Sequence, residues 1–180
     1  DITQLRDGSI VCSATLLKDS VFANEKRFAC LIYDGTTWRL GNASPYGVFD
    51  PLNFWEVALA QAEDNSLIAF MRNNDTGLSV GHRQALAYSQ DGGLNWTAPV
   101  YSPLPIHVER PWAESFGDNH VLLSLPDHRQ NREAHSLFLY NGVSLTPALL
   151  FSDAANGSEF SNVACFTVVH DRGVILCGFS

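Results

Sequence analysis

The amino-acid sequence predicts an all-β fold, a β-propeller of four-stranded antiparallel blades, and three observations support that prediction. Acidic turn signals recur about every 55 residues, and a second series of turns lies between them. Each turn is flanked by short apolar and β-branched runs of strand length. No segment shows a sustained helical period with capping residues. The first series is Asp7-Gly8, Asp64-Asn65, Asp118-Asn119 and Asp171-Arg172-Gly173, and the second is Asp34-Gly35, Asp91-Gly92-Gly93 and Asn141-Gly142.

Each repeat follows the order strand, tight turn, strand, longer loop, strand, tight turn, strand, which is the order of a propeller blade. We therefore expect a single propeller domain with blades at approximately residues 1–50, 51–104 and 105–157 and a partial blade at 158–180. These about three and a half blades are fewer than the four that a closed ring usually needs. The sequence thus predicts either part of a longer propeller or self-association that completes one.

The composition indicates a soluble globular protein with an acidic surface. Of the 180 residues, 46% are hydrophobic and 17% are charged, and the formal net charge is −8. Lys18 and Lys26 are the only lysines, and no basic run is present. Because affinity for phosphate backbones and anionic lipids needs clustered basic residues, nucleic acid and anionic membrane surfaces are not expected partners. No apolar stretch approaches the ~20 residues of a membrane helix, so membrane insertion is not expected.

The cysteines and glycosylation sequons leave the compartment open. Cys165 and Cys177 are equidistant from the Asp171 turn, so they are either buried free thiols or a cross-strand disulfide. The chain has four N-x-S/T sequons, a small excess over chance. A secreted or periplasmic location is slightly favoured by these features, and a cytoplasmic location is compatible with them.

The segment Ser89-Gln90-Asp91-Gly92-Gly93-Leu94-Asn95-Trp96 is the most specific motif. The carboxylate of Asp91 can accept backbone N–H bonds, Gly93 can adopt conformations closed to other residues, and Trp96 can pack back on the blade. We expect a structural role for Ser89, Asp91, Gly93 and Trp96. The motif resembles the Asp-box, or BNR repeat, of sialidases (neuraminidases) and of several unrelated propellers.

The resemblance to sialidases extends to the stretch before this motif. Sialidases carry a blade that reads approximately N-E-x-x-V-V-E-L-x-D-G-x-L-x-x-x-x-R and is followed by an Asp-box. The matching stretch here runs from Asn53 through Glu56, Val57 and Asp64 to Arg72. The resemblance implies a six-bladed, sialidase-like propeller in the complete protein.

Spacing alone places Glu56 and Arg72 together. They are symmetric about Asp64, so in an antiparallel hairpin we expect them to lie opposite each other, at the end far from the turn. That end belongs to the rim where loops between blades build a binding cleft. The pair is therefore either a binding site or a rim salt bridge with no ligand role.

The resemblance also implies roles for individual residues. Arg72 and Arg132, with Arg129 as an alternative to Arg132, would hold a sugar carboxylate, which the forked guanidinium fits. Glu56 would be the glutamate that activates a tyrosine nucleophile. Phe160 stands where that tyrosine is expected, so Tyr46 is a candidate substitute. Repeat register places Arg110 on the same rim, where core or rim packing is the favoured role of Arg110 and Trp112 and contact with a sugar is the alternative.

Two functions follow as hypotheses. The first is a sialidase-like glycoside hydrolase that acts on a terminal acidic sugar, with sialic acid as the leading candidate. The second is a non-catalytic propeller that binds carbohydrate or protein, or a glycosidase of different mechanism, as Phe160 suggests. The histidines form no metal-ligand pattern and no glycine-rich phosphate loop is present, so no metal or other cofactor is expected.

Overall fold

The computed structural model describes ten segments of the chain. They are residues 1–17, 26–43, 54–73, 84–101, 111–115, 121–127, 134–141, 145–152, 165–169 and 174–178. Within these segments, all the regular secondary structure is β-strand. Among the described residues, none forms a helix of the length and apolarity needed to cross a membrane.

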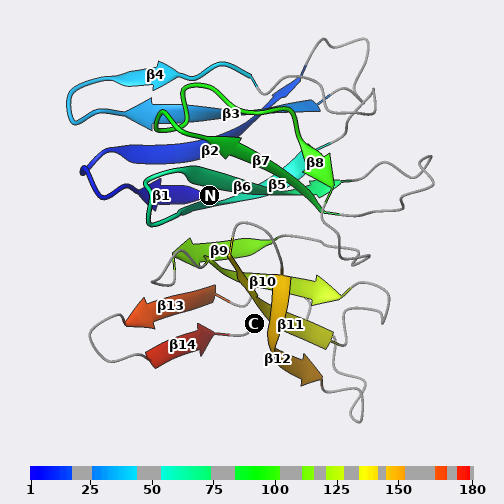
Figure 1. The fold of residues 1–180 in the computed structure, drawn as a ribbon. Helices are drawn as coiled ribbons and strands as arrows, with labels where there is room; N and C mark the ends of the chain where they lie inside the picture. Colours follow the sequence, from blue (N-terminus) through cyan, green and yellow to red (C-terminus); the bar gives the residue numbers. More distant parts are fainter. Residues whose placement is uncertain are drawn as a thin grey trace.

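The strands form three four-stranded antiparallel sheets and one two-stranded hairpin (Figure 1). The first sheet contains β1 (Ile2–Gln4), β2 (Ile10–Leu17), β3 (Lys26–Tyr33) and β4 (Trp38–Leu40). The second contains β5 (Phe54–Gln61), β6 (Leu67–Asn73), β7 (Ala85–Ser89) and β8 (Val100–Tyr101). The third contains β9 (Trp112–Ser115), β10 (Val121–Asp127), β11 (Ala134–Tyr140) and β12 (Leu145–Ser152), and the hairpin contains β13 (Cys165–Val169) and β14 (Val174–Gly178).

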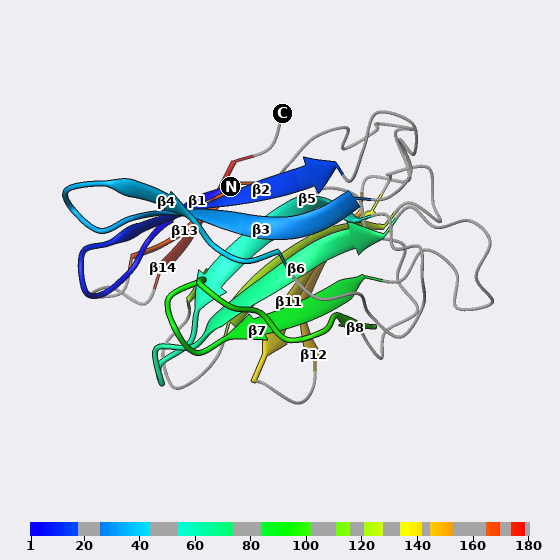
Figure 2. The same cartoon turned by 90° about the horizontal axis from the view of Figure 1, so that it is seen from above.

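Within each sheet, every strand pairs with its neighbour in the sequence. The first strands of successive sheets contact one another, β1 with β5, β5 with β9 and β9 with β13. In Figure 2 the strands of the first sheet lie over those of the second. This architecture confirms the predicted all-β class and its four-stranded antiparallel sheets, and it is that of part of a β-propeller.

The first turns of the first two sheets have the same construction. Asp7 Oδ1 accepts hydrogen bonds from Ser9 N at 2.9 Å and Ser9 Oγ at 2.6 Å, and Asp64 Oδ1 accepts the same pair from Ser66 at the same distances. Gly8 (φ 89°) and Asn65 (φ 67°) take the left-handed backbone position that follows each aspartate. The repeated turn signals of the sequence therefore mark equivalent turns.

Two apolar cores lie on opposite faces of the second sheet. Side chains such as Val11, Phe28 and Met71 fill the core between the first and second sheets. Side chains such as Phe70 and Tyr140 belong to the core between the second and third sheets, where their rings pack edge to face at 5.7 Å. The second sheet is thus held from both sides.

The register of the last hairpin corrects one prediction. Cys165 pairs with Gly178, and Cys177 pairs with Phe166. The two cysteines are therefore not cross-strand partners, because the turn is centred half a residue later than its symmetry about Asp171 suggested. Cys12 and Cys30 are free thiols, and burial raises the pKa of Cys30 to about 12.

Candidate functional site

Glu56 and Arg72 lie at the end of the second sheet far from the Asp64 turn, where β5 begins and β6 ends. Arg72 Nη1 is 2.8 Å from Glu56 Oε2. The side chains of Arg72 and Glu56 are 19% and 28% exposed, so the ion pair is partly shielded from water. The side chains of Glu56 and Arg72 thus lie together, as the spacing about Asp64 predicted.

The backbone register differs from the prediction, however. Arg72 pairs with Trp55, and Met71 pairs with Val57, so the register shifts at Glu56, which is the extra residue of a β-bulge. The expectation that Glu56 and Arg72 are direct cross-strand partners was therefore wrong by one residue. The bulge adds one residue to β5 and re-aims its side chain, a common feature near binding sites.

Glu56 also has a strained backbone. Its φ is 42°, in the left-handed region that costs a residue other than glycine about 1–3 kcal/mol. Asparagine tolerates this region better because its short side chain can hydrogen-bond locally, and glutamate lacks that advantage. Strained backbone of this kind is often found at functional sites, which makes Glu56 a candidate site residue.

Gln84 is a further polar residue beside this pair, and the sequence analysis missed it. It immediately precedes Ala85, which pairs with Met71, so its backbone lies next to that of Arg72 on β6. Gln84 is 1% exposed, and neither its Nε2 nor its Oε1 has a hydrogen-bond partner. Its signal in the sequence is a glutamine that opens an apolar strand in register with Arg72.

The motif at Ser89–Trp96 forms a closed turn at the opposite end of the sheet. Asp91 Oδ1 accepts hydrogen bonds from Asn95 N at 2.8 Å and Ser89 Oγ at 2.9 Å, and Gly93 N donates to Ser89 Oγ at 2.9 Å. Burial acts to raise the pKa of the Asp91 carboxyl, but hydrogen bonds from Asn95 and Ser89 outweigh it and hold the pKa below the usual value. These bonds are internal to the turn, which supports a structural role.

The same turn docks on the first sheet. The Trp96 ring packs edge to face on Phe28 of β3 at 4.6 Å, and its Nε1 donates to Gly93 O at 3.0 Å. Asn42 N donates to Leu94 O at 2.8 Å, and a Cβ at Gly41 would lie only 2.6 Å from Gly93 O. The loop after β4 therefore needs a glycine at position 41, where it contacts the turn.

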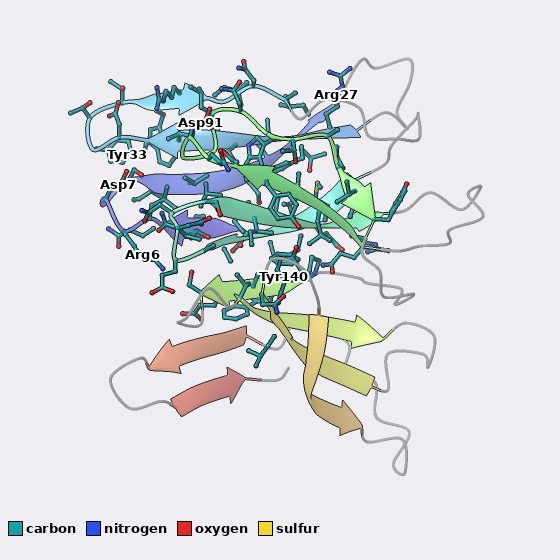
Figure 3. The ribbon with its side chains drawn as sticks, viewed as in Figure 1. Arg6, Asp7, Arg27, Tyr33, Asp91 and Tyr140 are labelled. Atoms are coloured by element: carbon teal, nitrogen blue, oxygen red, sulfur yellow. The ribbon has the colours of Figure 1, made fainter. Side chains whose placement is uncertain are left out.

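A polar cavity of about 660 Å³ lies along the first strands of the three sheets, away from Glu56 and Arg72. Arg6 reaches across it from the first turn and donates through Nη1 to Ala62 O at 2.8 Å and Glu63 O at 2.9 Å. Ser115 Oγ donates to Gln61 O from the third sheet. Figure 3 shows Arg6 and Asp7 at the turn end of the sheets and Arg27 at the other end. We assign the cavity to sheet assembly, because these side chains bond to backbone carbonyls.

The remaining predicted site residues lie outside the described part of the chain. They are Tyr46, Arg110, Arg129, Arg132 and Phe160. Trp112 is described, and it lines the polar cavity at the start of β9. The described residues contain no group of three or more histidine, cysteine or acidic side chains placed to hold a metal ion.

Comparison with known proteins reveals structural likeness without sequence likeness. No family model and no curated protein matches the chain. Its structure is similar to that of a protein of unknown function from Dyadobacter fermentans, with a TM-score of 0.62 and 22% identity over 84% of this chain and 41% of that one. It is similar to the NanB sialidase from Streptococcus pneumoniae, with a TM-score of 0.58 and 17% identity over 84% of this chain and 23% of that one.

A third likeness is to an exo-β-1,3-galactanase from Phanerochaete chrysosporium, with a TM-score of 0.60 and 10% identity over 85% of this chain and 38% of that one. At these identities the likenesses establish the fold, a sialidase-like β-propeller architecture. The chain spans less than half the length of each of these proteins.

Proposed function

We propose that this chain is part of a sialidase-like glycoside hydrolase that acts on a terminal acidic sugar, with sialic acid as the leading candidate. The observation that carries the proposal is the Glu56–Arg72 pair, a glutamate held at φ 42° in a bulge and 2.8 Å from a partly buried guanidinium. The resemblance of the surrounding motifs to sialidases and the propeller fold support it.

Arg72 would hold the carboxylate of the sugar. Its planar guanidinium can donate two parallel hydrogen bonds to a carboxylate, which fixes orientation as well as charge. Arg132 would contribute a second guanidinium, and Arg110 and Tyr46 would complete the binding surface. Glycan, or a small acidic sugar, is thus the proposed partner.

Glu56 would be the catalytic carboxylate. In sialidases a glutamate activates a tyrosine nucleophile, and a phenol suits a substrate whose own carboxylate repels a carboxylate nucleophile. A fixed carboxylate can take the proton of an attacking hydroxyl, and it can stabilise the positive charge that develops on the sugar ring. Gln84, beside Arg72, would add a neutral hydrogen-bonding group.

One observation favours a second candidate, a propeller that binds carbohydrate or protein without turnover. Phe160 occupies the sequence position at which the resemblance places the tyrosine nucleophile, and a phenyl ring cannot attack an anomeric carbon. A glycosidase with two carboxylates and no tyrosine is an intermediate possibility.

The test is hydrolysis of a fluorogenic sialoside by the complete protein from its native source. Glu56→Gln should lower kcat at least about 100-fold, because it removes the catalytic base while keeping the size of the side chain. Arg72→Ala should raise KM. Glu63→Gln is the matched control, an exposed glutamate beyond the other end of β5, and it should leave both constants unchanged.

Three results decide between the candidates. Turnover lost in Glu56→Gln supports the hydrolase. Binding of N-acetylneuraminic acid without turnover, weakened by Arg72→Ala, supports the binding module. If Arg72→Ala leaves sugar binding unchanged, Arg72 does not hold the sugar carboxylate, whether the protein is a hydrolase or a binding module.

A further inference from the structure

The side-chain amide of Gln84 is buried without a hydrogen-bond partner. Gln84 is 1% exposed, and neither its Nε2 nor its Oε1 is bonded. The other buried glutamine of the second sheet, Gln61, has the usual arrangement, because its Oε1 accepts a hydrogen bond from Arg6 N at 2.9 Å. A buried amide loses its hydrogen bonds to water, so leaving it unpaired costs stability. Gln84 therefore carries a donor and an acceptor that the fold itself does not use.

The strand register places Gln84 and Arg72 on the same face of the second sheet. Met71 of β6 pairs with Ala85 of β7, and both residues belong to the core shared with the first sheet. Arg72 follows Met71 and Gln84 precedes Ala85, so the two are cross-strand neighbours on the opposite face. That is the face on which Phe70 packs toward the third sheet. Side chains of such neighbours are within reach of each other.

Burial differs between the members of this group. The side chains of Glu56 and Arg72 are 28% and 19% exposed, whereas Gln84 is covered. A ligand that arrives from solvent can therefore touch Glu56 and Arg72, and Gln84 can act on that ligand through Arg72.

The guanidinium of Arg72 has more donors than one carboxylate can use. It is a rigid planar group with five N–H donors, and its Nη1 donates to Glu56 Oε2 at 2.8 Å. A ligand carboxylate that binds bidentately takes two parallel N–H groups from one edge. Because the group is planar, turning one edge to the ligand also sets the direction of the remaining N–H groups. The Oε1 of Gln84 is an unused acceptor on the same face of the sheet.

We propose that Gln84 is a positioning residue for Arg72, an inference that rests on the proposed function. When a ligand carboxylate binds Arg72, the Oε1 of Gln84 accepts a hydrogen bond from a guanidinium N–H, and this bond fixes the edge that Arg72 presents. Hydrogen bonds of an active site are often incomplete when the site is empty and form only in the complex. Gln84 thus sharpens the preference for acidic over neutral sugars without touching the sugar.

The test compares the binding of two sugars to the complete protein. They are the methyl α-glycoside of N-acetylneuraminic acid and its neutral analogue, in which the carboxylate is reduced to a hydroxymethyl group. Calorimetric titration gives both affinities, and their ratio is the preference for the acid. Gln84→Met keeps the volume of the side chain and removes the acceptor. It should lower this ratio about tenfold, as expected for the loss of one hydrogen bond.

Two comparisons separate a positioning role from a structural one. Gln61→Met is the matched control, because it makes the same substitution in a buried glutamine at the other end of the sheet, and it should leave the ratio unchanged. The second comparison is a double-mutant cycle with Arg72→Ala. Once Arg72→Ala has removed the guanidinium, adding Gln84→Met should change neither affinity further, because Gln84 acts through Arg72.

The outcomes distinguish this inference from the proposed function. A parent protein without preference for the acid, or with a preference that survives Arg72→Ala, contradicts the carboxylate clamp, and the positioning role falls with it. A preference that depends on Arg72 but is unchanged in Gln84→Met contradicts the positioning role alone. If Gln84→Met weakens the binding of both sugars equally, Gln84 contacts the sugar directly, and the inference is also overturned.

If Gln84→Met does not fold, Gln84→Asn decides. This variant keeps an amide in the buried position and withdraws it from Arg72 by one methylene group. It should lower the preference for the acid in the same direction, and thermal unfolding shows whether the fold is retained. A Gln84→Asn protein with the Tm and the sugar preference of the parent would overturn the inference.

Discussion

The two ends of the second sheet each contain a residue in the left-handed backbone region and a buried glutamine, but the two ends differ in how these are accommodated. At the turn end, the left-handed position is held by Asn65 at φ 67°, and the buried amide of Gln61 accepts a hydrogen bond from Arg6 N at 2.9 Å. At the other end, the left-handed position is held by Glu56 at φ 42°, and the buried amide of Gln84 has no hydrogen-bond partner.

The difference separates the end of the sheet that carries the turns from the end that carries the candidate site. At the turn end, the residue with positive φ is one that tolerates it and the buried amide is hydrogen-bonded. At the end with the candidate site, neither condition is met. Strained backbone and unsatisfied buried groups persist only where the surrounding structure enforces them, and they concentrate at functional sites. Of the four substitution experiments that follow, two compare the two ends directly and two measure how much the turns contribute to stability.

The largest expected effect is at the turn end. Trp96→Ala should lower the free energy of unfolding by about 3–5 kcal/mol, because it removes a buried ring packed on Phe28. In the 180-residue chain, Trp38→Ala should cost less than about 1 kcal/mol, because Trp38 is 54% exposed. Urea unfolding of both variants measures the comparison. Equal losses would show that the two tryptophan turns carry equal stability, contrary to their burial.

The two buried glutamines give the second experiment. Gln61→Met should destabilise the chain by about 1–3 kcal/mol, because Arg6 N loses its acceptor. Gln84→Met should leave stability unchanged or raise it, because it removes an unpartnered buried amide of similar volume.

The same pair of variants separates structural from functional roles in the complete protein. Gln84→Met should weaken binding of N-acetylneuraminic acid about tenfold, as expected for the loss of one hydrogen bond. Calorimetric titration measures it, with Gln61→Met as the control that should bind normally. A Gln84→Met variant that loses stability yet binds the sugar normally would make Gln84 a structural residue.

The sequence was sufficient for the parts of the fold that local chemistry decides. Turn aspartates such as Asp7 and Asp64 are visible because each must be followed by a residue that tolerates positive φ and by a serine that donates to the carboxylate. Those signals repeat, so the strands between them and the antiparallel sheets could be predicted as well.

The sequence was not sufficient to predict the features that depend on strand register. Symmetry about Asp64 predicts that Glu56 opposes Arg72, but the bulge makes Trp55 the partner. The bulge cannot be predicted from the spacing, because the extra residue changes the backbone conformation of Glu56 and not the composition of the strand. Gln84 was missed for a related reason, since its burial beside Arg72 depends on how three strands pair.

The two left-handed residues give the third experiment. Asn65→Glu should cost about 1 kcal/mol, because a glutamate lacks the local hydrogen bonding that lets asparagine adopt φ 67°. Glu56→Asn should leave the free energy of unfolding unchanged or slightly higher, since relief of backbone strain offsets the lost ion pair with Arg72, and it should abolish sugar turnover. A large destabilisation by Glu56→Asn would mean that Glu56 holds the rim together.

The smallest expected effect is the pH dependence contributed by the turn carboxylates. Hydrogen bonds from the side chain and backbone of Ser66 hold the pKa of Asp64 below its usual value, and those from Ser9 do the same for Asp7. A carboxyl whose pKa is lowered by folding stabilises the native state above its unfolded pKa of 3.8, and that contribution disappears as the pH falls through the folded value.

The Asp64→Asn variant isolates this contribution. It should lower Tm slightly at pH 7, and the difference from the parent protein should shrink as the pH falls below the unfolded pKa of 3.8 and Asp64 of the parent takes up its proton. Because Asp64 is exposed, solvent screening keeps the effect below about 1 kcal/mol. A difference that grows as the pH falls would have the wrong sign for a carboxylate stabilised by its turn. It would indicate that Asp64 is repelled by its acidic surroundings and that the turn end, too, is under strain.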